Sequence, residues 1–391
     1  MSRTTSTFFP PIMEAQSWMR GMTFTEQRPL INVSQAAPVD PPPEPLRRAI
    51  ADAALNDPGA HLYGPVLGLP DLRDQIARDW SAAYGSTLTR DNVAITSGCN
   101  QAFCATLAML TDEGDEIIIP TPWYFNHKMW MDMSGVKAVP LPARDGLLPD
   151  PEEARTLITD RTRAIVLVTP NNPGGVEYPA NLVTAFHELA KSNGLTLIVD
   201  ETYRDFDARD TRPHDLFTDP DWGDSFIQLY SFSKAYRLTG HRVGAIVAGQ
   251  QRIAEIEKFL DTVTVCPNQL GQRAALWGMQ NLRDWLAGER LEILDRRAAI
   301  TDHMGQIAPQ GWTLKGVGAY FAYLEHPFDM PSNQLAQKLV QDASVLLLPG
   351  TMFTPQTDPD GARHVRVAFA NVDRSGVKTL FERLKAFTSH A

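Results

Sequence analysis

A lysine and an arginine eight residues apart are the first candidates for chemistry in this sequence. Lys234 follows small hydroxyl residues and an apolar run at 226–230 that predicts a buried strand. A lysine amine removed from water has a lowered pKa, so it can act as the nucleophile that forms a Schiff base. Arg242 keeps its charge and presents a planar fork of donors, which suits a phosphate group. The two residues indicate a binding site only if other segments of the chain supply further groups that could bind the same ligand.

Polar side chains also follow two other apolar runs. Asp200 comes directly after Leu197–Val199, where a carboxylate is costly unless it meets a cation or a donor. It could cap a following helix, which is common, or pair with the protonated ring nitrogen of a cofactor, to which Tyr203 could also donate. Asn172 follows the run that ends at Val168. Its stretch could be a sharp reversal, or it could present the amide at the edge where ligands collect.

Two further segments offer groups that bind anions. Gly98, Cys99 and Asn100 form a turn between a strand-like run and a helix start, where free N–H groups attract negative charge. An ordinary strand-to-helix turn is the simpler interpretation of that stretch alone. Arg366 lies in an apolar run at 365–369. It would face solvent on an edge strand, whereas in a cleft it would bind a substrate carboxylate with two hydrogen bonds.

An alternating pattern of strands and helices would position these groups. From about residue 44 it predicts a largely parallel sheet with helices on both faces, and ligands collect at the carboxyl edge of such sheets. The strands expected in this sheet are 92–96, 116–119, 164–168, 196–200, 226–230 and 243–248. Long helices follow residue 268, and then a smaller α+β pattern with strands expected near 319–323, 345–348 and 365–369. The pair Gly316 and Gly318 lacks the third glycine and the context of a dinucleotide-binding fingerprint.

Length and composition exclude several classes of protein. The 391 residues exceed one ordinary hydrophobic core, so two domains are expected. A formal net charge of −10 argues against a general nucleic-acid binder. The three cysteines form no CxxC pair, the histidines show no metal-ligand spacing, and no apolar run reaches membrane-spanning length. We expect a cytoplasmic protein with no nucleic-acid partner, no membrane partner and no metal.

In their order along the chain, these segments resemble the class I/II aminotransferases, which are fold-type-I enzymes dependent on pyridoxal 5′-phosphate (PLP). The resemblance covers nearly the whole length, from about Pro29, and its most specific element is the S-x-S-K…G-x-R-x-G pattern at 231–244. It implies an α/β fold in which a large domain holds a mostly parallel seven-stranded sheet between helices, beside a smaller α+β domain. The expected divisions are an arm with part of the small domain (1–43), the large PLP-binding domain (44–274) and the C-terminal small domain (275–391).

The resemblance implies a role for each candidate residue. Lys234 would carry PLP as a Schiff base and move the substrate proton, and Asp200 would pair with the pyridine nitrogen. Asn172 and Tyr203 would bind the phenolic oxygen of PLP. The residues that would hold the phosphate are Gly98, Cys99, Asn100, Ser231 and Arg242.

Three further residues complete the implied site. Tyr124 would stack on the PLP ring, and Arg366 would hold the α-carboxylate of the substrate. Tyr63 would reach the phosphate of a neighbouring subunit, which implies a homodimer with shared sites.

Two departures from the family pattern bear on the reaction. Ala36 stands where the arm motif usually has a glycine close to the substrate, and its methyl group adds bulk and restricts φ. Thr354 replaces the last glycine of a P-G-x-x-F-G motif. We expect a ping-pong transaminase that moves the amino group of an L-amino acid, neutral or aromatic rather than acidic, to a 2-oxo acid. A PLP-dependent β- or γ-lyase, or a synthase with related chemistry, is the alternative that Ala36 and Thr354 leave open. A PLP-sensing regulator is opposed by the acidic charge, and we expect no extra N-terminal helix-turn-helix domain.

Overall fold

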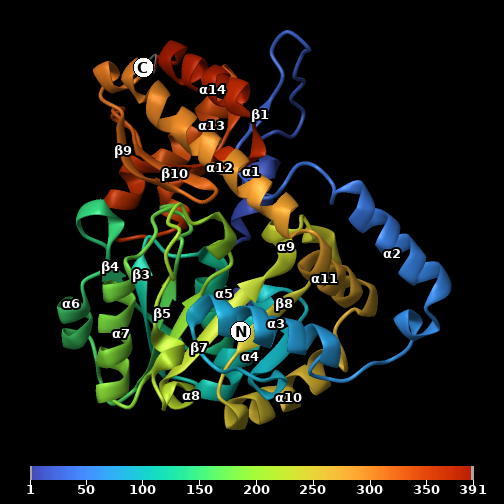
Figure 1. The fold of residues 1–391 in the computed structure, drawn as a ribbon. Coiled ribbons are helices and arrows are strands. Elements are labelled where there is room, and N and C mark those ends of the chain that lie inside the picture. Colours follow the sequence, from blue (N-terminus) through green and yellow to red (C-terminus); the bar gives the residue numbers. More distant parts are fainter. Residues whose placement is uncertain (1, 389–391) are drawn as a thin grey trace.

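The larger part of the chain folds around a mostly parallel sheet in the computed structural model, which describes residues 2–388 (Figure 1). The strands of this sheet are β2 (Val93–Thr96), β3 (Glu116–Thr121), β4 (Lys137–Pro142), β5 (Thr162–Val168), β6 (Thr196–Asp200), β7 (Phe226–Ser231) and β8 (Gly244–Val247). They lie in the order β2-β8-β7-β6-β5-β3-β4, which makes the seven-stranded sheet expected from the sequence. Strand β8 is antiparallel to both neighbours, and the other neighbouring pairs are parallel.

Helices cover both faces of this sheet because its strands carry apolar side chains on both sides. The covering helices are α3 (Pro70–Tyr84), α4 (Cys99–Leu110), α5 (Phe125–Ser134), α7 (Ala180–Ser192), α10 (Gln250–Thr264) and α11 (Gln269–Asn281). Along β6, Leu197 and Val199 pack with α3, α7 and α11, whereas Ile198 packs with α4, α5 and α10. Side chains alternate along a strand, so Asp200 lies on the same face as Ile198. The expectation of a parallel sheet between helices is confirmed.

A smaller antiparallel sheet forms the second unit, which includes the C-terminal part of the chain (Figure 1). Its strands are β9 (Thr313–Gly318), β10 (Phe321–Glu325), β12 (Leu348–Pro349) and β13 (His364–Ala368), in the order β12-β13-β10-β9. The helices of this unit are α12 (Arg283–His303), α13 (Ser332–Ala343) and α14 (Arg374–Ala386). The arm joins it through β1 (Ile31–Asn32), which pairs in parallel with β11 (Val345–Leu346). The boundaries at 43 and 274 remain predictions.

The other α-helices of the described chain lie outside these two groups. They are α1 (Pro11–Ser17), α2 (Glu44–Asn56), α6 (Pro151–Thr156), α8 (Trp222–Ser225) and α9 (Phe232–Ala235). Helix α2 packs on α11 at the side of the molecule (Figure 1). Among residues 2–388, no helix combines the length and the apolar character needed to cross a membrane.

Candidate active site

A cavity of about 630 Å³ lies at the carboxyl edge of the large sheet, where the arm and the small sheet meet it. A volume of this size is in the range of sites that bind cofactors and small molecules. The residues predicted from the sequence that line it are Ala36, Cys99, Asn100, Tyr124, Asn172, Asp200, Tyr203, Ser231, Lys234, Arg242 and Arg366. They come together because β2, β5, β6 and β7 run in the same direction and end at this edge.

One end of the cavity is suited to an anion. Gly98 has a φ of +85°, and a Cβ there would overlap the guanidinium of Arg242. Helix α4 begins at Cys99, directly after this glycine, so its first N–H groups point out of the helix at the same place. Arg242 Nη1 lies 3.4 Å from Ser233 Oγ, and Ser231 Oγ accepts a hydrogen bond from Ser233 N. The turn, the arginine and the hydroxyl groups together are suited to bind an anion, and we refer to them as the anion site.

Lys234 projects into the middle of the cavity from α9, the single helical turn after β7. Its Nζ donates a hydrogen bond to the backbone carbonyl of Ala36 in the arm. Burial, together with the positive charges of Arg366 and Arg242, lowers the pKa of Lys234 to about 7. Its ordinary value is 10.5, so a large fraction of this amine is uncharged and nucleophilic near neutral pH.

Asp200 is a buried carboxylate that stays ionised. Burial alone would raise its pKa, but hydrogen bonds from His127 and Thr202 hold the pKa below its ordinary value. The Nε2 atom of His127 lies 3.3 Å from Asp200 Oδ2, and Thr202 N donates to Oδ1 at 3.0 Å. The next helical turn begins only at Arg204, so the helix-cap interpretation of Asp200 is wrong. An ionised, buried carboxylate beside a ligand cavity suits a protonated ring nitrogen.

His127 is a residue of the site that the sequence interpretation missed. It lies on α5, its ring stacks on that of Phe103 at 3.9 Å, and it is buried. Its Nδ1 has no hydrogen-bond partner among residues 2–388. A single histidine, here between Asn126 and Lys128, carries no signal by itself. The available signal was its position three residues after Tyr124, which places both at the start of one helix.

The other end of the cavity is built around Arg366, which is 2% exposed. Its Nη1 donates to Asn172 Oδ1 at 2.9 Å, and its Nη2 donates to the carbonyl of Ser34. The guanidinium lies 4.9 Å from the ring centres of both Phe321 and Phe353. Strand β13 lies between β12 and β10, so the alternative of a solvent-facing arginine on an edge strand is wrong. Its Nε has no partner in the described part of the chain, which leaves a donor for a carboxylate.

Two tyrosines face the cavity and a third lies outside it. Tyr203 is buried, and burial raises the pKa of its hydroxyl, so it remains a proton donor. The hydroxyl of Tyr124 lies 3.4 Å from Asn100 Oδ1. Tyr63 is 86% exposed and is not among the described residues that line this cavity. Ala36 is buried and packs with the apolar cluster of the small sheet.

The residues present fit PLP. Its phosphate matches the anion site at Gly98 and Arg242, and its pyridine nitrogen matches the ionised carboxylate of Asp200. Its aldehyde needs an uncharged amine, which Lys234 supplies. The fold and the cavity therefore define a PLP-dependent enzyme of fold type I.

The model of the family described as aminotransferase class I and II matches residues 28–384, so the chain belongs to this family. It is a PLP-dependent aminotransferase. The aspartate aminotransferase of Pyrococcus horikoshii is 28% identical over 84% of this chain and 83% of its own length. The aromatic aminotransferase ISS1 of Arabidopsis thaliana is 26% identical over 98% of this chain and 94% of its own.

A solved structure supports the fold separately. A mutant aspartate aminotransferase of Thermus thermophilus superposes with a TM-score of 0.87 at 24% identity, covering 99% of both chains. The names of the two sequence relatives refer to different amino-acid substrates, aspartate in one and aromatic amino acids in the other. The family match therefore defines the reaction but not the amino donor.

Proposed function

We propose that this aminotransferase takes the amino group from an L-amino acid with a neutral or aromatic side chain and gives it to a 2-oxo acid in a ping-pong reaction. The observation that carries the proposal is the charge of the cavity wall. Among the described residues that line it, the lysine and arginine side chains are Lys234, Arg242 and Arg366. Arg242 belongs to the anion site, so Arg366 is the arginine that remains. It binds the α-carboxylate of the substrate, which leaves no arginine for a second carboxylate among the described lining residues.

The wall beyond Arg366 supports an apolar side chain on the substrate. Pro11 and Ile12 of the arm and Phe125 of α5 line the cavity, and the ring of Phe125 packs against that of Phe353, which lies beside Arg366. Apolar walls favour apolar or aromatic groups and leave the second carboxylate of an acidic substrate unpaired.

Each residue has a proposed task in the reaction. When bound, PLP supplies a carbon that accepts the amino group and a ring that takes up electrons from the substrate Cα. Asp200 keeps the ring nitrogen protonated, and Lys234 takes the proton from Cα. Arg366 fixes the carboxylate, which orients the Cα–H bond towards Lys234. Asn172 and Tyr203 donate to the phenolic oxygen, and Tyr124 covers one face of the ring.

We also propose a homodimer in which Tyr63 serves the site of the neighbouring subunit. Tyr63 and Leu62 are 86% and 65% exposed, and Val263 and Val265 are also exposed large apolar residues. Exposed apolar side chains of this kind are typical of an interface. The three cysteines are free, which supports a reducing, cytoplasmic location for the protein.

The test is a kinetic screen of the twenty amino acids with the PLP-loaded protein, in the presence and absence of a 2-oxo acid. Neutral or aromatic amino acids should give a higher kcat/KM than aspartate and glutamate. A preference for aspartate would refute the proposed donor class. Multiple turnovers without a 2-oxo acid would instead indicate a lyase, since a lyase needs no acceptor.

A further inference from the structure

The loop that carries Asn172 is packed against the small sheet so closely that only glycine fits between them. A Cβ on Gly316 would come within 2.5 Å of the carbonyl oxygen of Gly174, and a Cβ on Gly318 would overlap that of Gly175. A Cβ on Gly175 would in turn lie 2.6 Å from Gly318 N. Gly316 and Gly318 are therefore required by a backbone contact between the two units.

Hydrogen bonds close the same loop at its base. Asn171 N donates to Val176 O at 2.7 Å, and Gly175 N donates to Asn171 O at 2.8 Å. Tyr178 N donates to Thr169 Oγ1 at 2.9 Å. These bonds tie the two ends of the loop to each other and restrict the backbone position of Asn172.

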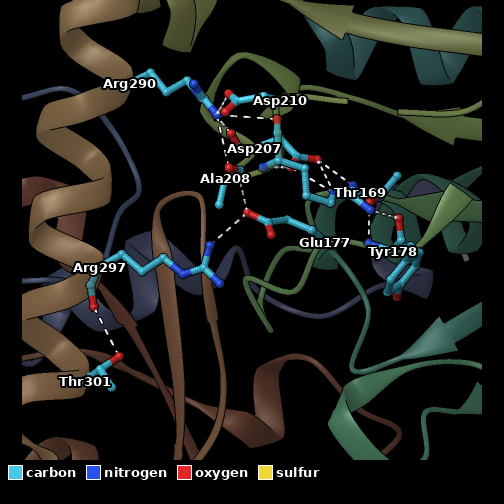
Figure 2. Close-up of polar contacts among 10 residues, drawn as sticks. Thr169, Glu177, Tyr178, Asp207, Ala208, Asp210, Arg290, Arg297 and Thr301 are labelled. Carbon is cyan, nitrogen blue, oxygen red and sulfur yellow. Dashed lines mark hydrogen bonds and ion pairs between the residues drawn. The ribbon is translucent and has the colours of Figure 1, made fainter. Parts of the chain in front are cut away.

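Glu177, which follows this closed loop, links it to two other segments (Figure 2). Its Oε1 accepts a hydrogen bond from Ala208 N at 2.8 Å and forms an ion pair with Arg297 Nη1 at 3.1 Å. The side chain of Glu177 is only 10% exposed and that of Arg297 is 29% exposed, so water screens the pair less than it screens a surface pair. The segment around Ala208 follows Tyr203, and Arg297 belongs to α12.

Helix α12 holds the segment after Tyr203 at a second point. Arg290 projects from α12 toward the same loops as Arg297 (Figure 2). It donates to the carbonyl oxygens of Asp207 at 2.7 Å and Ala208 at 3.1 Å, and to the carboxylate of Asp210 at 2.7 Å. The segments that follow Asn172 and Tyr203 in the chain are thus both bound to α12.

We propose that these contacts form a latch between the two sheets, and that Glu177 and Gly318 are positioning residues for substrate binding. Asn172 binds Arg366 directly, at 2.9 Å. The strand of Arg366 pairs with β10, and β10 pairs with β9, which carries Gly318. The latch therefore keeps Asn172 in register with Arg366, whereas the turn at Gly98 is attached to the large sheet alone. The inference rests on the roles proposed for Asn172 and Arg366.

The first test adds a single methyl group between the backbone of β9 at Gly318 and the backbone of the loop at Gly175. Gly318→Ala should raise the KM for the amino acid by roughly 10- to 100-fold, because a small misplacement of binding groups has effects of that order. The dissociation constant for PLP, measured by spectral titration, should change little because the anion site is untouched. Gly305→Ala is the matched control, since a Cβ there meets no heavy atom of the described chain within 4 Å.

The second test removes charge and keeps shape. Glu177→Gln preserves an oxygen for Ala208 N but removes the ion pair with Arg297, so the KM for the amino acid should rise several-fold. Arg297→Gln should have a similar effect, Arg297→Lys a smaller one, and the effects of Glu177→Gln and Arg297→Gln should not add in the double variant. Asp295→Asn, which breaks an exposed ion pair between α12 and Arg374, is the control.

The outcomes separate the latch from simple stabilisation. A lowered Tm with unchanged KM and kcat in Glu177→Gln and Gly318→Ala would overturn the proposal. If Gly318→Ala does not fold, the Glu177 and Arg297 variants decide the question alone. Arg366→Gln serves as the reference: an unchanged KM in that variant would refute the proposed role of Arg366. A raised KM there, with none in the latch variants, would refute the latch alone.

Discussion

The two ends of the cavity are assembled in different ways. At the anion end, Gly98 lies directly before its helix, and Arg242 is only 9 positions from its partner Ser233. At the carboxylate end, Arg366 binds Asn172 and Ser34, which are 194 and 332 residues away in the chain. The first end joins two short segments of the large sheet, the turn at Gly98 and the segment from Ser231 to Arg242. The second exists only when the arm, a loop of the large sheet and a strand of the small sheet meet.

This difference predicts how each end fails. At the anion end, backbone N–H groups at the start of a helix contribute to anion binding, and the arginine beside them comes from a segment of the same sheet. A buried arginine needs partners to offset its desolvation, so its geometry depends on every segment that supplies one. Damage at the anion end should lower the retention of PLP, and damage at the carboxylate end should weaken substrate binding. The following variants test this division, beginning at the residue between the two ends.

Lys234→Ala should have the largest effect, because both ends serve this amine. Loss of a positioned proton-transferring group costs roughly 10²- to 10⁴-fold, and this variant also loses the nucleophile, so kcat should fall by at least the upper figure. The measurement is the transaminase rate of the purified variant with excess PLP. Turnover close to that of the unmodified protein would show that another amine reacts.

Asp200→Asn should have the next largest effect. The amide keeps the shape of the side chain but cannot hold a proton on the ring nitrogen, so kcat should fall by roughly 10²- to 10³-fold, as for loss of one preorganised electrostatic group. Asp221→Asn, at the residue directly before α8, is the control, since its side chain is 71% exposed. Equal rates in Asp200→Asn and the control would contradict the proposed pairing.

The division between local and distant assembly also explains what the sequence could predict. Strands β3, β5, β6 and β7 were found because their apolar runs are buried on both faces. Strand β4 was missed because it lies at the sheet edge, is partly exposed and contains Pro140 and Pro142. The reversal after β5 was recognised as a candidate site, but its packing against Gly316 and Gly318 depends on contacts between remote segments.

The same reasoning applies within the site. Lys234 and Arg242 share a spacing that can be read along the chain. His127 contacts Asp200, 73 positions later, and stacks on Phe103. No periodicity of the sequence connects these three residues, so only the folded chain places them together.

Arg366→Gln and Arg242→Gln should separate the two ends directly. Each removes a charged hydrogen-bonding group worth about 1.5–3 kcal/mol, which corresponds to roughly a 10- to 100-fold change in affinity. Arg366→Gln should raise the KM for the amino acid while PLP remains bound. Arg242→Gln should instead raise the dissociation constant for PLP, measured by spectral titration. If both variants lose the same ligand, the two ends are not independent.

The smallest expected effect is a shift in the pH midpoint of PLP uptake. It tests whether the charges at the two ends of the cavity both alter the pKa of Lys234. The uncharged amine is the reactive form, and the pKa of Lys234 is about 7. The rate at which PLP-free protein takes up saturating PLP should therefore rise with pH and level off above pH 7, instead of rising towards 10.5.

Besides burial, two positive neighbours lower the pKa of Lys234, Arg366 more than Arg242. Removing either charge makes the ammonium less unfavourable, so the midpoint should move to higher pH, further in Arg366→Gln than in Arg242→Gln. No shift in Arg366→Gln would show that the carboxylate end does not act on the lysine. A larger shift in Arg242→Gln would contradict the expected order of the two charges.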